Sequence, residues 1–283
     1  DKIELHIVRY NHISHLLLNP MKPPFDDWNV RWALQLAADR NDWHAFMTAG
    51  AIKMSTPVYG LHPDGGWGIP YEEYSKFPGW RQDKKDEDIA EANRLLDGAF
   101  GKGIRPRLEQ YIIQLVSRRE TSLWSIDFYK KTLGLEFDVK YVDTYGNVQT
   151  QCLYTIRAEA NPTYSQNIIK DPSDAYSYYN HSKWRVHELC RQTGWKGSGI
   201  SPPEEEARID AMIEELDTSL DVERRRELVR KLELYMVNER TNNIQLGLMN
   251  VAWPNRYELK GVHYYGLGTY GQQRLTEYIW LAK

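Results

Sequence analysis

The sequence has little cysteine, no long apolar run and no excess of basic charge. Its 283 residues include two cysteines, Cys152 and Cys190, and no apolar stretch approaches the roughly 20 residues that a membrane-spanning helix needs. Lys and Arg total 36 against 39 Asp and Glu, which gives a net charge of -3. These absences argue against a disulfide-dense scaffold, a spanning helix and a nucleic-acid partner. The length allows one large or two modest domains, and a single bridge between the two cysteines stays open.

Signatures of catalysis and of metal binding are also missing. The 8 histidines form no H-x-x-x-H pair on a helix and no zinc-like cluster with cysteine, and neither a P-loop nor a G-x-S-x-G motif occurs. GLGTYG at 266–271 matches G-x-G-x-x-G, but only 12 residues follow it, too few to reach the acidic residue that a dinucleotide site requires further along. We therefore expect no enzyme activity, no cofactor and no metal site.

The sequence is rich in amphipathic aromatic side chains, with 10 Trp and 19 Tyr against 6 Phe. A flat apolar ring with a polar edge suits ligands that are partly apolar and partly hydrogen-bonding, such as peptides and sugars. The plainer interpretation of each single Trp is a half-buried packing role. The aromatic content and the available carboxylates also admit a glycan-active enzyme, although Glu204–Glu206 at a predicted helix start are explained by helix-end electrostatics.

Hydrophobic periodicity predicts an α/β chain. Residues 107–116, 119–133 and 135–142 form a strand, a helix and a strand joined by short turns, which predicts a βαβ unit and a partly parallel sheet. Region 143–200 has a weak pattern. Further strands are predicted at 2–9 and 243–252, and further helices at 83–101 capped by Asp83, at 203–217, and at 221–239 capped by Asp221.

Residues 19–40, NPMKPPFDDWNVRWALQLAADR, begin with a stretch rich in proline and aspartate and continue as a predicted helix. Its prolines hold the preceding backbone extended, and Asp26 or Asp27 can cap the helix. Asp39 or Asn41 can cap a second helix that runs to Gly50. Arg31 and Arg40 are placed to meet these aspartates or neighbouring carbonyl groups, so we expect this stretch to build the fold rather than to touch a ligand.

Several motifs together resemble the family-5 extracellular solute-binding proteins of peptide and oligopeptide ABC importers. They are the stretch at 19–40, EANRLLDGA at 91–99, ARIDAMIEEL with the following D-x-E-x-R-R-E-L at 207–228, and NRYELKGV at 255–262. They occur in the family's order over nearly the whole chain. The chain begins at Asp1 without an initiator Met or a signal segment, so we expect a processed chain or a piece of a longer one.

The resemblance implies an α/β fold that is the second lobe of a two-lobed, type II periplasmic-binding-protein-like clam, with a mixed sheet and flanking helices. The C-terminal ligand-binding lobe would span 10–250, and 1–9 and 251–283 would be crossover segments to a missing first lobe. It further implies capture of a peptide or other oligomeric solute by lobe closure and delivery to the membrane subunits of an ABC permease. The expected protein is a monomer located in the periplasm or outside the cell, membrane-associated through the transporter.

The resemblance also points to a cleft wall. Family members place a G-W-x-x-D-Y segment before a D-P pair, where the Asp holds a peptide's ammonium group and the Trp packs on the ligand. Asp171-Pro172 fits the pair, but Ile168 stands at the expected Asp position and Ser165 at the Trp position. Because an unpaired ammonium in a closed cleft is costly, a ligand without that charge becomes more plausible.

The candidate ligand-binding residues come from this polar and aromatic region. Arg157 could meet a carboxylate or a sugar hydroxyl, and Tyr164 or Trp184 could stack on a ring. For each candidate a packing or surface role is an equal alternative, and an oligosaccharide-specific receptor or a stand-alone interaction module also remains open. The candidates are Tyr154, Arg157, Asn161, Tyr164, Asn167, Asp171, Tyr178 and Trp184.

Overall fold

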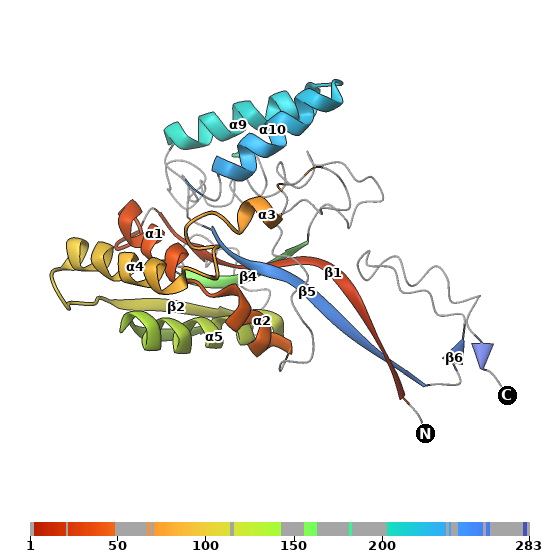
Figure 1. The fold of residues 1–283 in the computed structure, drawn as a ribbon, viewed down its shortest axis with the longest axis horizontal. Coiled ribbons are helices and arrows are strands. Elements are labelled where there is room, and N and C mark those ends of the chain that lie inside the picture. The colour runs from red at the N-terminus through yellow and green to blue at the C-terminus, as the bar shows by residue number, and fades with distance from the viewer. Residues whose placement is uncertain are drawn as a thin grey trace.

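The fold is built around one mixed five-stranded sheet, seen in the computed structural model in Figure 1. The structure describes residues 3–20, 22–48, 67, 69, 71–113, 116–142, 156–162, 181–182, 203–235, 238, 243–256, 259–260 and 280–281. The strands of the sheet are β1 (Ile3–Leu18), β2 (Arg107–Ile113), β3 (Glu136–Val142), β4 (Ile156–Pro162) and β5 (Asn243–Arg256), and a separate short pair is formed by β6 (Leu259–Lys260) and β7 (Trp280–Leu281).

The strand order is β3-β2-β4-β1-β5. β2 pairs in parallel with both β3 and β4, whereas β1 pairs antiparallel with β4 and β5. The parallel pair β2 and β3 is joined by helix α5 (Val116–Leu133), which confirms the predicted βαβ unit. The mixed α/β class expected from the sequence is therefore confirmed.

Most of the other helices begin close to the predicted residues, although α3 was not predicted and α10 ends five residues before the predicted 239. Asp27, rather than Asp26, caps α1 by accepting a hydrogen bond from the Asn29 backbone N–H at 2.8 Å. Asp39 accepts from two backbone N–H groups at the start of α2, and Asp221 does the same for α10. The bounds are α1 (Trp28–Ala37), α2 (Arg40–Thr48), α3 (Tyr71–Tyr74), α4 (Lys85–Phe100), α9 (Pro203–Thr218) and α10 (Val222–Leu234).

Some local predictions were wrong. Helix α4 has Lys84 at its N-cap position and no side-chain cap, so Asp83 does not cap it. Strand β1 extends well past the predicted 2–9, because it pairs with β4 as far as Leu18 and with β5 as far as Leu17. In β3 the alternation of Phe137, Val139 and Tyr141 along the sequence would predict one buried face, but Val139 and Tyr141 are exposed because β3 is the edge strand of the sheet. None of the described helices is long and apolar enough to cross a membrane.

One face of the sheet forms the main hydrophobic core. Paired residues share this face, as in Leu108 opposite Phe137 and Leu16 opposite Ile244. Helices α1, α2, α4 and α5 pack on it, and the indole of Trp43 and the ring of Tyr129 lie fully buried there. The stretch at 19–40 contributes to this core. Phe25 is buried there, and its carbonyl group accepts a 2.6 Å hydrogen bond from Arg31.

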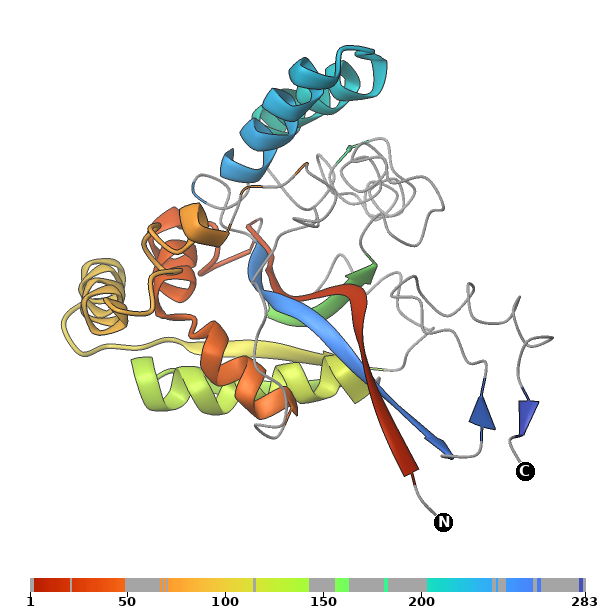
Figure 2. The same cartoon turned by 45° about the vertical axis from the view of Figure 1, so that its right-hand side comes forward.

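A second core lies beneath the helical hairpin of α9 and α10, which stands apart from the sheet in Figures 1 and 2. Ile209 and Ile213 of α9 and Val229 of α10 are fully buried against the segment that carries Tyr74 and Trp80. The Glu233 carboxylate is also buried here and accepts a 2.7 Å hydrogen bond from the Ile69 backbone N–H. Burial raises the pKa of Glu233 well above its usual value.

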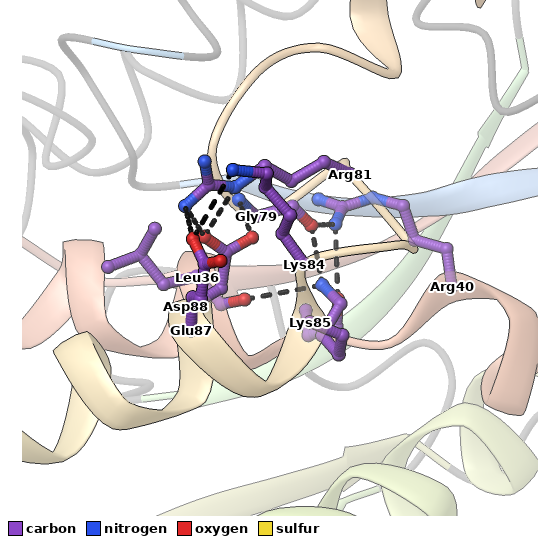
Figure 3. Close-up of polar contacts among 9 residues, drawn as sticks. Leu36, Arg40, Gly79, Arg81, Lys84, Lys85, Glu87 and Asp88 are labelled. Atoms are coloured by element: carbon purple, nitrogen blue, oxygen red, sulfur yellow. Dashed lines mark hydrogen bonds and ion pairs between the residues drawn. The ribbon is translucent and has the colours of Figure 1, made fainter.

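Gly79 lies against the end of α1 and next to Trp80 of the second core, and Figure 3 shows the polar contacts around Gly79. Its carbonyl accepts hydrogen bonds from Arg40 at 2.6 Å and from Lys85 at 2.8 Å, and its N–H donates to Asp88 at 2.7 Å. Asp88 in turn accepts two bonds from Arg81. Burial lowers the pKa of Lys85 to about 8. This group of residues, which we call the Gly79 node, fixes the turn that leads from the second core into α4.

The Gly79 node also ends α1. Lys85 donates to the carbonyl groups of Leu36 and Ala38, at 3.3 and 2.9 Å, which α1 leaves without helical partners. The Arg40 guanidinium stacks 3.5 Å from the centre of the Trp80 ring, and Trp80 belongs to the second core. The end of α1 and the second core are therefore held by the same two cations.

Candidate functional site

The sheet reverses its direction of growth at β2, and this reversal defines a candidate site. The chain passes from β2 to β3 on one side, and β4 then lies on the other side of β2. In open α/β sheets, ligands bind outside the carboxyl ends of the parallel strands at such a switch point. The carboxyl ends of β2 and β4 lie at Ile113 and Pro162, so the site is expected beyond these residues.

A row of paired positions crosses the whole sheet on the face opposite the main core. Lys140 of β3 pairs with Tyr111 of β2, which pairs with Arg157 of β4. Arg157 pairs with Leu17 of β1, and Leu17 pairs with Asn243 of β5. Since paired residues share a face, the backbone register assigns these positions to one largely polar surface.

The β2 and β3 part of this surface is a charged cluster. The Lys140 ammonium contacts the Glu109 carboxylate at 2.6 Å, and this hydrogen bond holds the pKa of Glu109 below its usual value. Burial, followed by the hydrogen bond to Glu109, raises the pKa of Tyr111. Burial lowers the pKa of Lys22, against the opposing charge of Glu109. Within this cluster, the positive charge of Lys140 is paired with the negative charge of Glu109.

Nearer the middle of the same surface, polar groups are buried. His15 of β1 pairs with Gln245 of β5 and with Glu159 of β4, and His15 and Gln245 are each 2% exposed. Neither polar atom of the Gln245 amide has a hydrogen-bond partner among the described residues. Sequence analysis missed both residues, because each stands in an otherwise β-forming run that gives no sign of which face is polar.

Of the predicted ligand-binding residues, two lie in a described element. Arg157 occupies the central position of the row across the sheet, and Asn161 pairs with Ile13 near the carboxyl end of β4. The backbone thus places both on one strand at the switch point, four positions apart, which is an even spacing and so one face. The remaining candidates lie outside the described residues, as do both cysteines: Tyr154, Tyr164, Asn167, Asp171, Tyr178 and Trp184, with Cys152 and Cys190.

A further contact ties the predicted ligand-binding region to α9. The Asp210 carboxylate accepts hydrogen bonds from the Ser182 backbone N–H at 2.8 Å and from the Ser182 hydroxyl. His181 lies between Asp210 and Glu214, with nitrogen-to-oxygen distances of 3.6 and 3.4 Å. Sequence analysis missed Asp210, although its position between the apolar Ile209 and Ile213 could have marked it as facing partly inward.

Within the described part of the chain, no group of three or more His, Cys, Asp or Glu side chains could hold a metal ion. The described side chains of the site offer hydrogen bonding and charge pairing, as in the contact between Lys140 and Glu109.

Comparison with known proteins identifies the relatives of this chain. No protein-family model matches it. Over 146 residues, half of the chain, it is 27% identical to the periplasmic oligopeptide-binding protein OppA of Escherichia coli K12, of which the match covers 24%. The chain is thus similar in sequence to a periplasmic binding protein of the kind that its motifs resemble. The resemblance inferred from the motifs is thereby confirmed.

Solved structures agree on the fold. The murein tripeptide binding protein MppA of Escherichia coli aligns with a TM-score of 0.70 at 14% identity over 99% of this chain. The periplasmic binding protein DppA of Helicobacter pylori, in complex with the peptide STSA, aligns with a TM-score of 0.69 at 14% identity, again over 99% of this chain. The chain covers 50% and 49% of these two proteins, so it has the fold of about half of such a protein.

OppA, MppA and DppA are all named as binding proteins, and none as an enzyme. The expectation from the sequence that this chain is not an enzyme agrees with these relatives.

Proposed function

We propose that this chain is the second lobe of the solute-binding component of an ABC importer. It captures a peptide or another oligomeric solute by lobe closure and delivers it to the permease subunits in the membrane. The observation that carries the proposal is the alignment of 99% of this chain with about half of MppA and of DppA, a peptide-bound binding protein. We further propose that it is a monomer that works in the periplasm or outside the cell, and the periplasmic location of OppA supports this.

The ribbon of β1 and β5 supports the two-lobed arrangement. From Ile3 to Arg9 the first strand pairs with β5 alone, because β4 begins to pair only at His12. Both views show these two strands running side by side away from the helices, towards the N-terminus (Figures 1 and 2). The register shift between Arg9 and Ile13 falls at the proposed lobe boundary. We propose 10–250 as the lobe, and 1–9 and 251–283 as crossover segments.

In this proposal the ligand lies beyond the carboxyl ends of β2 and β4, against the surface that includes positions 157 and 161. Closing a second lobe over it removes water and strengthens each hydrogen bond to the ligand. A single lobe supplies only part of that enclosure, so the isolated chain should bind far more weakly than a two-lobed product of the same gene.

A ligand screen tests the proposal. An equimolar pool of synthetic tetrapeptides and a pool of oligosaccharides are each added to the two-lobed product and to the isolated chain. A ligand that binds only the folded state raises the melting temperature, and at 100 times its Kd it adds about 2.7 kcal/mol of stability. We expect the peptide pool to stabilise the two-lobed product. Stabilisation by oligosaccharides alone would replace peptide with glycan as the solute, and equal affinity of both proteins would defeat the two-lobed arrangement.

The nature of the ligand can be tested more sharply through its amino group. Ile168 stands where relatives in the family pattern place the Asp that holds a peptide ammonium. Replacing a free peptide N-terminus by an acetylated one should therefore change the Kd by less than about threefold, because no charge pair is lost. A loss of about a hundredfold on acetylation would mean that another carboxylate takes this role.

A further inference from the structure

We propose that Arg230 and Glu233 of α10 form a pH-sensitive clasp on the chain segment that leads into α3. The clasp is closed while Glu233 carries a proton, and it opens when that proton is lost. It acts within the second core, so it does not rest on the proposed function.

The clasp holds the segment at two points. Arg230 forms an ion pair with Glu73 of α3. Three positions further along the same face of α10, Glu233 accepts a 2.7 Å hydrogen bond from the Ile69 backbone N–H. Residues 69 and 73 therefore lie against one face of α10, and the two contacts together fix the position and the direction of the segment.

The carboxyl group of Glu233 has no cation of its own. Its side chain is fully buried, and its Oε1 atom has no hydrogen-bond partner among the described residues. Arg230, which favours the ionised form, is already paired with Glu73, which opposes it. An ionised carboxylate without a partner is costly inside a protein, and burial accordingly raises the pKa of Glu233. The closed clasp therefore holds Glu233 as a neutral acid.

Several other titratable groups surround the second core. Of these groups, Arg230 and Glu73 act on the charge of Glu233, with opposite signs. The other three arginines lie over aromatic rings, that of Tyr235 or that of Trp67. Loss of the Glu233 proton is therefore not offset by a neighbouring charge. The groups are Arg225, Arg226, Arg230 and Tyr235 in α10 and at its end, Glu73 and Tyr74 in α3, and Glu206, Arg208 and Asp210 in α9.

Loss of the Glu233 proton opens the clasp, because the charged carboxylate reaches water only when the segment packed over it moves. An exposed Glu233 has its ordinary pKa of 4.5, whereas the closed form keeps its proton above that pH. Opening therefore releases one proton at any pH between 4.5 and the pKa of the closed form. By linkage, each unit of pH in this interval raises the population of the opened form about tenfold relative to the closed form.

The experiment measures hydrogen exchange of the backbone amides of residues 69–77 in the two-lobed product between pH 5 and pH 7. The rates are converted to protection factors, which removes the effect of pH on the exchange chemistry itself. Glu233→Gln is the test variant, because its amide is a neutral side chain of the same shape. Glu227→Gln is its control, because Glu227 lies on the same helix with a side chain 63% exposed.

We expect the protection factors of 69–77 in the parent protein to fall about tenfold per pH unit. Those of Glu233→Gln should stay constant, those of Glu227→Gln should follow the parent, and the amides of α1 should keep their protection in all three proteins. A constant protection factor in the parent, or a fall that persists in Glu233→Gln, would overturn the role of Glu233. An equal fall in α1 would mean that the whole fold opens, which would refute a clasp confined to the second core.

The contact of Arg230 is tested separately. Arg230→Met keeps the apolar stem of the side chain but removes the ion pair with Glu73. It should lower the protection factors of residues 71–77 about threefold at every pH, as expected for a partly exposed ion pair. Unchanged protection would remove Arg230 from the clasp and refute the attachment at two points.

Discussion

Replacing Gly79 by alanine should destabilise the protein strongly, because both its backbone conformation and its surroundings require glycine. Its φ is +82°, a region that costs an L-residue about 1–2 kcal/mol. A Cβ built at this position would lie 2.7 Å from the Gln35 carbonyl oxygen and 3.2 Å from the Leu36 Cα. Both are backbone atoms at the end of α1, so no change of side-chain rotamer can move them away. Relieving the overlap should therefore cost about a further 1–3 kcal/mol of stability.

Two other glycines separate these contributions. Gly103 also has a positive φ, +73°, but nothing lies within 4 Å of a built Cβ. Gly103→Ala should therefore cost only the conformational part, about 1 kcal/mol after the loss of unfolded-state entropy is subtracted. Gly98 lies inside α4 and also has open space around it. Gly98→Ala should therefore raise the free energy of unfolding of the protein by about 0.5–1 kcal/mol.

Urea unfolding followed by circular dichroism gives the free energy of unfolding of all three variants under one condition. We expect Gly79→Ala to lose about 2–4 kcal/mol and to be the least stable of the series. Equal losses for Gly79→Ala and Gly103→Ala would refute the close approach of Gly79 to α1, and with it the Gly79 node as the junction of the two cores.

Two further predictions concern individual acids. Burial raises the pKa of Glu233 above its ordinary value of 4.5, so the folded chain keeps a proton that the unfolded chain loses, and stability present below pH 4.5 is lost as the pH rises towards the folded pKa. Glu233→Gln should remove this decline, so the melting temperature of the variant should rise relative to that of the parent as the pH increases from 5. Parallel plots of melting temperature against pH would contradict a raised pKa of Glu233. Asp221→Ala removes the acceptor for the Glu223 and Arg224 N–H groups and should cost about 1 kcal/mol of unfolding free energy in urea. Asp83→Ala, its control, should cost less than about 0.5 kcal/mol because Asp83 does not cap α4; equal losses would argue against the cap.

The elements that could be predicted from the sequence are those with strong local signals. Asp221 and the apolar spacing after it predict α10, and the helix predicted at 119–133 ends at Leu133, as α5 does, just before Gly134 with its φ of +70°. The error at Asp83 shows the limit of such signals. The turn before α4 is set by the Gly79 node, whose partners come from α1, α2 and α4, so a tertiary contact overrides the local capping preference.

The candidate site was less predictable, because its polar surface exists only through strand pairing. Arg157 was proposed from its residue type, but its place beside Tyr111 and Leu17 depends on a register between strands far apart in sequence. His15 and Gln245 could be recognised only once β1 and β5 were paired. A shift of one residue in that pairing would exchange the two faces, and no local pattern specifies it.

The residues that mark the family and those proposed to meet the ligand are separate for a physical reason. In the PPFDD stretch, Phe25 is buried and bonded to Arg31, and Asp27 caps α1. Arg40, at the end of the same stretch, joins α2 to the Gly79 node. These contacts serve any ligand equally, so their chemistry can stay constant while the ligand changes. In the proposed function, positions 165 and 168 belong to the cleft wall, so a change of ligand would act on them first. In the proposed function, we therefore expect the departure from the family pattern at these two positions to affect which ligand is bound rather than the fold.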